Sequence, residues 1–240
     1  MTLLILGGTG EARQIADRFA GTDAVISLAG ATRVPLAQGL PTRIGGFGGA
    51  DGFAAYLQEA GITAVLDATH PYAAAITVRT AEVCAQKGLP YVQFLRPPWE
   101  PEPGDLWTQI VREEDAAAHI ATGDTVFLGT GRQTLERFAN LEGCTVICRQ
   151  IDPPEGPFPF AGGRFLVGRP PFSVADEVAL FSELGVDWLV VKNAGGAPSR
   201  TKLTAARQLG IPVLMIARPL QGDWQTVSSI DDALAWVAAL

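Results

Sequence analysis

The chain has 240 residues, of which 48% are hydrophobic and 18% are charged, so it has enough apolar material for a folded core and is not a disordered sequence. Its formal net charge of -7 excludes nucleic acid and anionic membranes as bulk partners, because the long-range field of the protein repels polyanions. The length fits either one large α/β domain or two small ones.

Short apolar runs alternate with longer amphipathic stretches, a rhythm that predicts parallel sheet covered by helices. The predicted strands are 3–7, 24–28, 64–68, 91–95, 125–129, 145–149, 163–167, 188–192 and 212–216. The predicted helices are 12–19, 52–60, 73–87, 174–184, 201–209 and 229–240. The fold class is therefore α/β with parallel sheets.

The first predicted strand runs into the glycine loop LILGGTGEAR, residues 4–13, which opens a helix. Backbone N–H groups and the helix dipole favour a diphosphate in such a place, so a dinucleotide site is predicted. The predicted contacts are Gly7, Gly8, Thr9, Gly10, Glu11 and Arg13. Because Arg13 stands where the dinucleotide fingerprint has its third glycine, a plain strand-to-helix turn stays an alternative.

The second predicted strand ends in VISLAGATR, residues 25–33, without the carboxylate that binds the ribose of NAD. Ser27, Thr32 and Arg33 supply hydroxyl donors and a cation instead, which suit a 2′-phosphate and favour NADP. The alternative is that Arg33 caps a surface loop.

The third predicted strand ends in LDATHPYAAA, residues 66–75, at the sheet edge where ligands of this fold bind. The polar group Asp67, Thr69, His70 and Tyr72 is a candidate for binding and proton transfer. Taken singly, Asp67 could instead cap the next helix, and His70 could hydrogen-bond to backbone.

The stretch RPPWEPEPGD, residues 96–105, has four prolines and is predicted to be an interdomain linker. Residues 1–97 would form an NADPH-binding domain and residues 98–240 a second α/β domain. The loop FLGTGRQTL, residues 127–135, echoes the first glycine loop and places Gly131 and Arg132 at another strand-to-helix turn.

The segment LVVKNAGGAPSRTKL, residues 189–203, gathers cations, an amide and glycines between a strand and a helix. Such a loop is predicted to bind a polyanion. The candidates are Lys192, Asn193, Gly195, Gly196, Arg200 and Lys202. No metal is predicted, since two histidines and three cysteines show no ligand spacing. With no signal-like start and no apolar run long enough for a membrane, we expect a cytoplasmic protein.

These segments together resemble the precorrin-6A reductase family of cobalamin biosynthesis. The similar blocks include DATHPYAAAI, YVQFLRPPW, RPPFSVADE and the run from VVKNAGGAPSRTKL to IARP, and they extend from residue 4 to 219. Two of them depart from the family's usual pattern, at Pro170 and Ala194.

The resemblance implies an NADPH-dependent reductase that adds hydride and a proton across one carbon–carbon double bond of a ring-contracted tetrapyrrole, precorrin-6A. It also implies two Rossmann-like domains with the active site in the cleft between them. Asp67, His70 and Tyr72 would then be the catalytic candidates. Arg96 joins the loop residues above as a substrate-binding candidate, and the oligomeric state is left open, a monomer included.

Two other functions fit parts of the sequence. A short-chain-type NADP reductase of another small substrate usually carries a Tyr-x-x-x-Lys pair, which is absent because Ala60, Ile76 and Leu95 follow the three tyrosines at that spacing. A non-catalytic NADP-binding sensor would need the nucleotide site but no second polyanion site.

Overall fold

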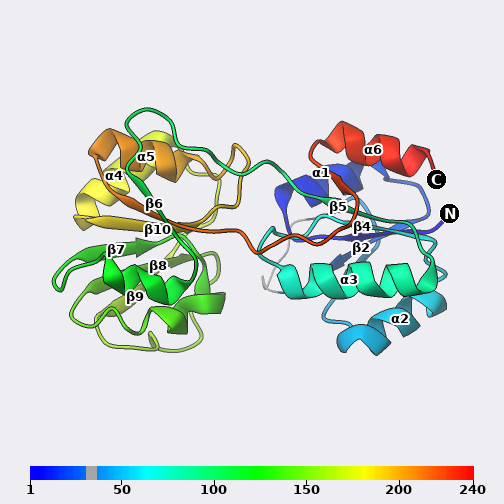
Figure 1. The fold of residues 1–240 in the computed structure, drawn as a ribbon, viewed down its shortest axis with the longest axis horizontal. Helices are drawn as coiled ribbons and strands as arrows, with labels where there is room; N and C mark the ends of the chain where they lie inside the picture. Colours follow the sequence, from blue (N-terminus) through cyan, green and yellow to red (C-terminus); the bar gives the residue numbers. More distant parts are fainter. Residues whose placement is uncertain (31–36) are drawn as a thin grey trace. The chain divides into compact units, whose positions relative to one another are not determined.

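A computed structural model describes residues 1–30 and 37–240. The chain divides into two compact units (Figure 1): the first comprises residues 1–97 and 219–240, and the second comprises residues 98–218. The division falls in the proline-rich stretch. The predicted second domain of 98–240 is too long, because residues 219–240 pack in the first unit.

The first unit holds a six-stranded parallel sheet in the order β12-β5-β4-β1-β2-β3. Its strands are β1 (Leu3–Leu6), β2 (Ala24–Leu28), β3 (Thr42–Ile44), β4 (Ala64–Asp67), β5 (Tyr91–Phe94) and β12 (Thr226–Val227). Its helices are α1 (Gly10–Arg18), α2 (Gly49–Glu59), α3 (Ala74–Lys87) and α6 (Ile230–Ala238).

The second unit holds another six-stranded parallel sheet, in the order β6-β11-β10-β7-β8-β9. Its strands are β6 (Trp107–Ile110), β7 (Thr125–Leu128), β8 (Thr145–Gln150), β9 (Gly163–Val167), β10 (Trp188–Lys192) and β11 (Val213–Ile216). Its helices are the 3₁₀ segments η1 (Glu113–Ala118) and η2 (Arg132–Phe138) and the α-helices α4 (Val174–Leu184) and α5 (Thr201–Leu209).

Each sheet has the strand order of the Rossmann fold, so the predicted class of two parallel α/β domains is confirmed. The sixth strand of each sheet, however, is not the strand that follows the fifth along the chain. β6 follows β5 along the sequence but pairs with β11, whereas β12 follows β11 but pairs with β5. The last strands are therefore exchanged along the chain: the second unit is the continuous stretch 98–218, whereas the first is discontinuous and needs residues 219–240 to complete its sheet.

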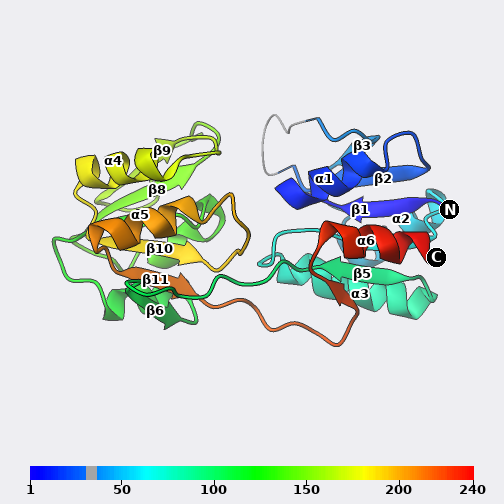
Figure 2. The same cartoon turned by 90° about the horizontal axis from the view of Figure 1, so that it is seen from above.

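Helices cover both faces of the first sheet (Figures 1 and 2). Alternation along β1 sends Leu3 and Ile5 to the face under α1 and α6 and sends Leu4 and Leu6 to the face under α2 and α3. All four side chains are buried, as strands covered on both faces require.

In the second sheet, α4 and α5 pack against one face through a cluster that includes Phe127, Phe181 and Leu203. On β10, Val191 belongs to this cluster, so the next residue, Lys192, points to the opposite face. Lys202 lies on α5 itself. The two lysines of the predicted polyanion loop therefore lie on different sides of the sheet.

The nine predicted strands all form, whereas β3, β6 and β12 were not predicted. These three strands are two to four residues long, and they lie at sheet edges with several exposed residues. Edge strands with little buried surface carry no apolar run that a sequence pattern could reveal. Among the described residues, no helix has both the length and the apolar character needed to cross a membrane.

Candidate functional site

The first glycine loop lies at the carboxyl end of β1, beside the carboxyl end of β4. β1 is the strand at which the chain order of the sheet reverses, so this is the topological switch point where ligands of open α/β sheets bind. Thr9 joins the two strands here, because its hydroxyl donates to the carbonyl of Ala68 at 2.9 Å. The same oxygen accepts from the N–H of Ala12 at 3.0 Å and caps α1.

The glycines of the loop have separate structural reasons. A Cβ at Gly7 would lie 2.8 Å from Ile26 Cδ1, so this glycine lets the loop pack on β2. Gly8 has φ of +117°, a conformation that favours glycine. At Gly8 and Gly10 an added Cβ would meet no atom within 4 Å, so the space above both residues is open. The loop is thus packed on one side and accessible on the other.

Two predicted ligand residues pair with each other. Arg96 Nη1 lies 2.6 Å from Glu11 Oε2, and both side chains are largely buried in the first unit. Glu11 was predicted to contact the cofactor and Arg96 the substrate. The ion pair holds the segment after β5 against the first turn of α1 and neutralises both charges. Arg13 also lies in this first turn, where its N–H donates to the carbonyl of Thr9 at 3.3 Å.

The predicted 2′-phosphate site is only partly described. Ser27 is buried at the end of β2, whereas Thr32 and Arg33 lie outside the described residues. The structure adds Arg43 on the neighbouring strand β3, whose Nη1 lies 3.4 Å from Ser27 Oγ and whose Nη2 donates to the carbonyl of Gly46 at 2.7 Å. Its guanidinium carbon lies 3.9 Å from the centre of the Phe47 ring. Arg43 therefore places a cation beside the end of β2, and this position follows from the pairing of β3 with β2 and not from a sequence motif.

Asp67 is fully buried at the end of β4 and accepts four hydrogen bonds. The donors are Thr69 through its N–H at 3.0 Å and its hydroxyl at 2.7 Å, the Thr77 hydroxyl at 2.7 Å and the Tyr91 hydroxyl at 3.2 Å. Burial, followed by the charge and hydrogen bond of Asp67, raises the pKa of Tyr91 above its usual range. The arrangement does not fit the predicted role of Asp67 as a proton donor and makes this carboxylate an organiser of the loop.

His70 and Tyr72 are half-buried in the loop between β4 and α3. The N–H of Tyr72 donates to His70 Nδ1 at 3.3 Å, and the two ring centres lie 5.6 Å apart. An Nδ1 that accepts leaves the proton of a neutral imidazole on Nε2. His70 therefore presents a donor from Nε2, and Thr69, bonded to Asp67, holds the start of this loop.

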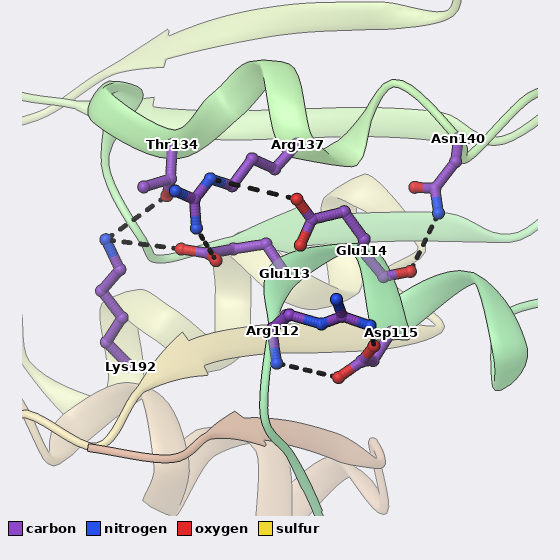
Figure 3. A network of polar contacts seen from close by, with 8 residues as sticks. All are labelled: Arg112, Glu113, Glu114, Asp115, Thr134, Arg137, Asn140 and Lys192. Atoms are coloured by element: carbon purple, nitrogen blue, oxygen red, sulfur yellow. Dashed lines mark hydrogen bonds and ion pairs between the residues drawn. The ribbon is translucent and has the colours of Figure 1, made fainter. Parts of the chain in front are cut away.

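The second sheet has its own switch point, between β7 and β10. The turn after β7 contains Gly131, with φ of +74°, and the exposed Arg132 at the start of η2. Across it, Lys192 Nζ lies 3.3 Å from Thr134 Oγ1 and 3.9 Å from Glu113 Oε1 (Figure 3). The two glycine loops, whose sequences resemble each other, therefore occupy the same position in two Rossmann-like sheets.

Glu113, at the start of η1, was not predicted. Figure 3 shows its carboxylate between Lys192 and Arg137, whose Nη1 donates at 3.1 Å. Burial opposes the charge of Glu113, but hydrogen bonds from backbone, Thr134 and Arg137, together with the charge of Lys192, hold its pKa below the usual range. Burial lowers the pKa of Lys192, and Glu113 counteracts this effect. No motif marks Glu113, because the exchanged strand β6 brings it to the site.

The KNAGG turn is held by backbone contacts. The Asn193 amide accepts from the N–H of Trp99 at 2.8 Å and donates to the carbonyl of Trp99 at 3.0 Å. The Trp99 indole donates to the carbonyl of Gly196 at 2.8 Å, and Gly195 and Gly196 have φ of +70° and +81°. Asn193 thus fixes the loop, and its side-chain amide is engaged on both sides.

The remaining predicted cations differ in their surroundings. Arg200 forms an ion pair with Glu102, which also pairs with Arg207. Lys202 Nζ donates to the carbonyl of Ser199 at 2.7 Å and lies 5.7 Å from the Trp99 ring. Among the described residues, no group of three or more His, Cys, Asp or Glu side chains could hold a metal ion.

Comparison with known proteins places this geometry in a family. The family model described as "Precorrin-6x reductase CbiJ/CobK" matches residues 2–238. A precorrin-6A reductase of Rhodococcus erythropolis is 46% identical over 99% of this chain and 98% of its own length, and one of Rhodobacter capsulatus is 41% identical over 98% and 95%. A solved structure named CobK precorrin-6A reductase superposes with a TM-score of 0.95 at 41% identity and covers 100% of this chain and 97% of its own. The chain belongs to the precorrin-6x reductase CbiJ/CobK family.

Proposed function

We propose that this chain is an NADPH-dependent reductase that adds hydrogen across one carbon–carbon double bond of precorrin-6A and gives precorrin-6B. The observation that carries this proposal is the open glycine loop at the switch point of the first sheet, in a chain that belongs to a reductase family. A plain turn needs no open space above its glycines.

The first unit has groups that fit a dinucleotide. Thr9 satisfies the N–H of Ala12, and the helix has two further first-turn N–H groups, at Gly10 and Glu11, that can donate to a diphosphate. Gly8 and Gly10 leave room for close approach, Gly7 lets the loop pack on β2, and Arg13 lies in the same turn. When bound, NADPH would supply the hydride.

Preference for NADPH over NADH is proposed to come from the end of β2. Ser27, Thr32 and Arg33 are the proposed contacts of the 2′-phosphate, and Arg43 supports them with a charge beside Ser27. An Arg33→Glu variant should bind NADPH more weakly and NADH about as well as before. An unchanged NADPH-to-NADH ratio of kcat/KM would remove this assignment.

The proton is proposed to come from the loop after β4. His70 holds a proton on Nε2 through the hydrogen bond at its Nδ1, and Tyr72 supplies that bond from its backbone. Asp67 and Thr69 shape the loop without direct transfer, since the carboxylate is buried and accepts four hydrogen bonds. Proton donation at the neighbouring ring carbon completes the reduction.

The second unit is proposed to bind the carboxylates of the macrocycle. Its candidate cations are the exposed Arg132 and the partly buried Lys192 and Lys202, with Gly131, Gly195 and Gly196 as backbone donors. Arg200 and Arg96 are weaker candidates, because Glu102 and Glu11 already neutralise them. Asn193 would act by holding the loop.

One experiment separates the proposed function from the two other candidates. The purified chain is mixed with NADPH and precorrin-6A without oxygen, and the absorbance of both chromophores is followed. The proposal predicts that both spectra change together. A reductase of another substrate would bind NADPH and leave both spectra unchanged, and a sensor would do the same with every candidate substrate.

A further inference from the structure

A pocket of about 160 Å³ lies at the carboxyl edge of the second sheet. Gly129 follows β7, Arg149 lies near the end of β8, and Gly168 follows β9, so three neighbouring strands point at it. The first residues of α5, Thr201 and Lys202, line the opposite side. This edge is where open α/β sheets bind ligands, and the volume is several times the roughly 30 Å³ that one water molecule occupies in the liquid.

One wall of the pocket is a buried ion pair. Arg149 Nη1 and Nη2 donate to the two oxygens of Glu177 at 2.7 and 2.8 Å, and the side chains are only 9% and 1% exposed. The guanidinium also lies 4.3 Å from the centre of the Phe172 ring. Bidentate geometry and the aromatic face fix Arg149, and the two opposite charges cancel within the wall.

Lys202 adds a charge that no carboxylate of the described part of the chain pairs with. Its Nζ donates to a single backbone carbonyl, that of Ser199, although an ammonium group has three donors. Two cations thus face one carboxylate at this pocket, which leaves a net positive charge when Lys202 is protonated. Burial lowers the pKa of Lys202 to about 8, with Arg149 acting in the same direction and Glu177 against it.

The size and the charge of the pocket together indicate which ligand it can bind. An anion of a few heavy atoms fits the pocket, can accept from Lys202 Nζ and lies near the first-turn N–H groups of α5. Phe172 and Pro170 provide apolar contact for a short carbon chain. A carboxylate on a short arm meets all of these conditions.

We propose that this pocket binds one acetate or propionate arm of the macrocycle, with Lys202 Nζ and the Thr201 hydroxyl as donors and the Arg149–Glu177 pair as a fixed wall. The inference rests on the proposed function, because that function supplies the substrate with such arms. It assigns binding roles to Thr201, Arg149, Glu177 and Phe172, none of which was a predicted site residue. A phosphate of the cofactor is the other source of an anion with the same chemistry.

The test compares two binding constants in the full chain, those for precorrin-6A without cofactor and for NADPH without macrocycle. Lys202→Met should weaken precorrin-6A binding at pH 7 by about tenfold or more, the loss of one charge-assisted hydrogen bond, and leave NADPH binding unchanged. Thr201→Val should weaken it by a smaller factor in the same direction. Lys87→Met, at the end of α3 in the first unit, is the matched control and should change neither constant.

Each other outcome overturns the inference. Equal precorrin-6A binding by the wild-type chain and both pocket variants means that the arm binds elsewhere. A weaker NADPH constant in Lys202→Met means that the pocket holds a cofactor phosphate. If the wild-type chain reduces precorrin-6A while these variants bind it normally, only the pocket assignment fails. If the wild-type chain neither binds nor reduces it, the proposed function fails as well.

Discussion

Four hydrogen bonds converge on the carboxylate of Asp67, which has no exposed surface. Leaving a buried polar atom without a partner costs free energy, and three of the four bonds come from side chains, those of Thr69, Thr77 and Tyr91. His70, three residues later, differs because its ring is half-buried and its Nδ1 accepts from a backbone N–H. Two residues that a sequence motif groups together therefore have different tasks.

Asp67→Asn tests the structural role. An amide NH₂ would face hydroxyl donors that now point at a carboxylate oxygen, so we expect the free energy of unfolding to fall by about 1 to 3 kcal/mol. Denaturant unfolding of the wild-type chain and the variant measures this difference in free energy. The turnover number of the folded fraction should change little.

His70→Gln tests the proton-transfer role. The amide keeps a polar side chain of similar length but cannot act as a general acid, so we expect kcat for precorrin-6A reduction to fall by roughly 100-fold. Stability should change by less than about 0.5 kcal/mol, as is usual for a partly exposed position. The opposite pattern, with activity lost in Asp67→Asn and retained in His70→Gln, would contradict both assignments.

Lys202 makes stability depend on pH in a defined direction. Burial lowers its pKa in the folded chain from 10.5 to about 8, so between these values the unfolded chain holds more protons and stability rises with pH. We expect the stability of the wild-type chain relative to Lys202→Met to increase by roughly 1 to 3 kcal/mol from pH 7 to pH 10. Denaturant unfolding of both proteins across this range measures the difference. A constant difference would mean that Lys202 keeps an ordinary pKa.

At the scale of elements, α1 and its loop connect the sequence to the proposed cofactor site. The Thr9 hydroxyl caps the helix and also bonds to the end of β4, so one side chain fixes the helix N-terminus relative to two strands. Glu11 and Arg96 tie the same turn to the segment after β5. The helix N-terminus is therefore held in place before any ligand binds.

Thr9→Val removes the cap and the bond to Ala68 at nearly constant volume. We expect the free energy of unfolding to fall by about 1 to 2 kcal/mol, the usual cost of losing an N-cap. NADPH binding should weaken together with this loss of stability. Thr9→Ser, which keeps the hydroxyl, is the control and should retain most of the stability and most of the NADPH affinity. Equal loss in the two variants would contradict the assignment to the hydroxyl, because Thr9→Ser keeps that group.

The central strands could be predicted because burial on both faces leaves continuous apolar runs, as in β1, β4 and β10. The α-helices could be predicted in part from their ends, because α4 and α5 end at glycines in the left-handed conformation. The segments η1 and η2 could not be predicted as 3₁₀ helices, since they are short and lack a long amphipathic pattern. The glycine loops were found because strand, loop and helix are adjacent in sequence. Arg43, Glu113 and the Arg149–Glu177 pair depend on contacts between distant segments.

At the scale of the whole molecule, the exchange of β6 and β12 determines which residues meet. β6 brings η1, and with it Glu113, to the switch point of the second sheet, while β12 and α6 complete the first unit. The first core includes Ala233 and Val237 of α6 beside Leu3 and Ile5 of β1. Local sequence patterns predict elements, but they carry no information on which sheet the last strand joins, so the extent of the second domain was predicted wrongly.

A chain that ends at Arg218 tests the exchange. It would lose β12 and α6, so the first sheet would expose an edge at β5 and an apolar face at β1. We expect hydrogen exchange in residues 1–97 to accelerate and NADPH binding to be lost, while residues 107–216 keep their protection. Loss of protection in the second unit instead would contradict the assignment of residues 219–240 to the first.

The proposed function requires that the chain transfers hydride from NADPH to a carbon of precorrin-6A. The most direct measurement uses NADPH with deuterium at the transferable position of nicotinamide, mixed with the purified chain and precorrin-6A without oxygen, followed by mass spectrometry of the macrocycle. Hydride transfer should give a product with one deuterium and one solvent hydrogen more than the substrate, formed at the rate at which NADPH is consumed. A macrocycle of unchanged mass, or a reduced product without deuterium, would contradict it.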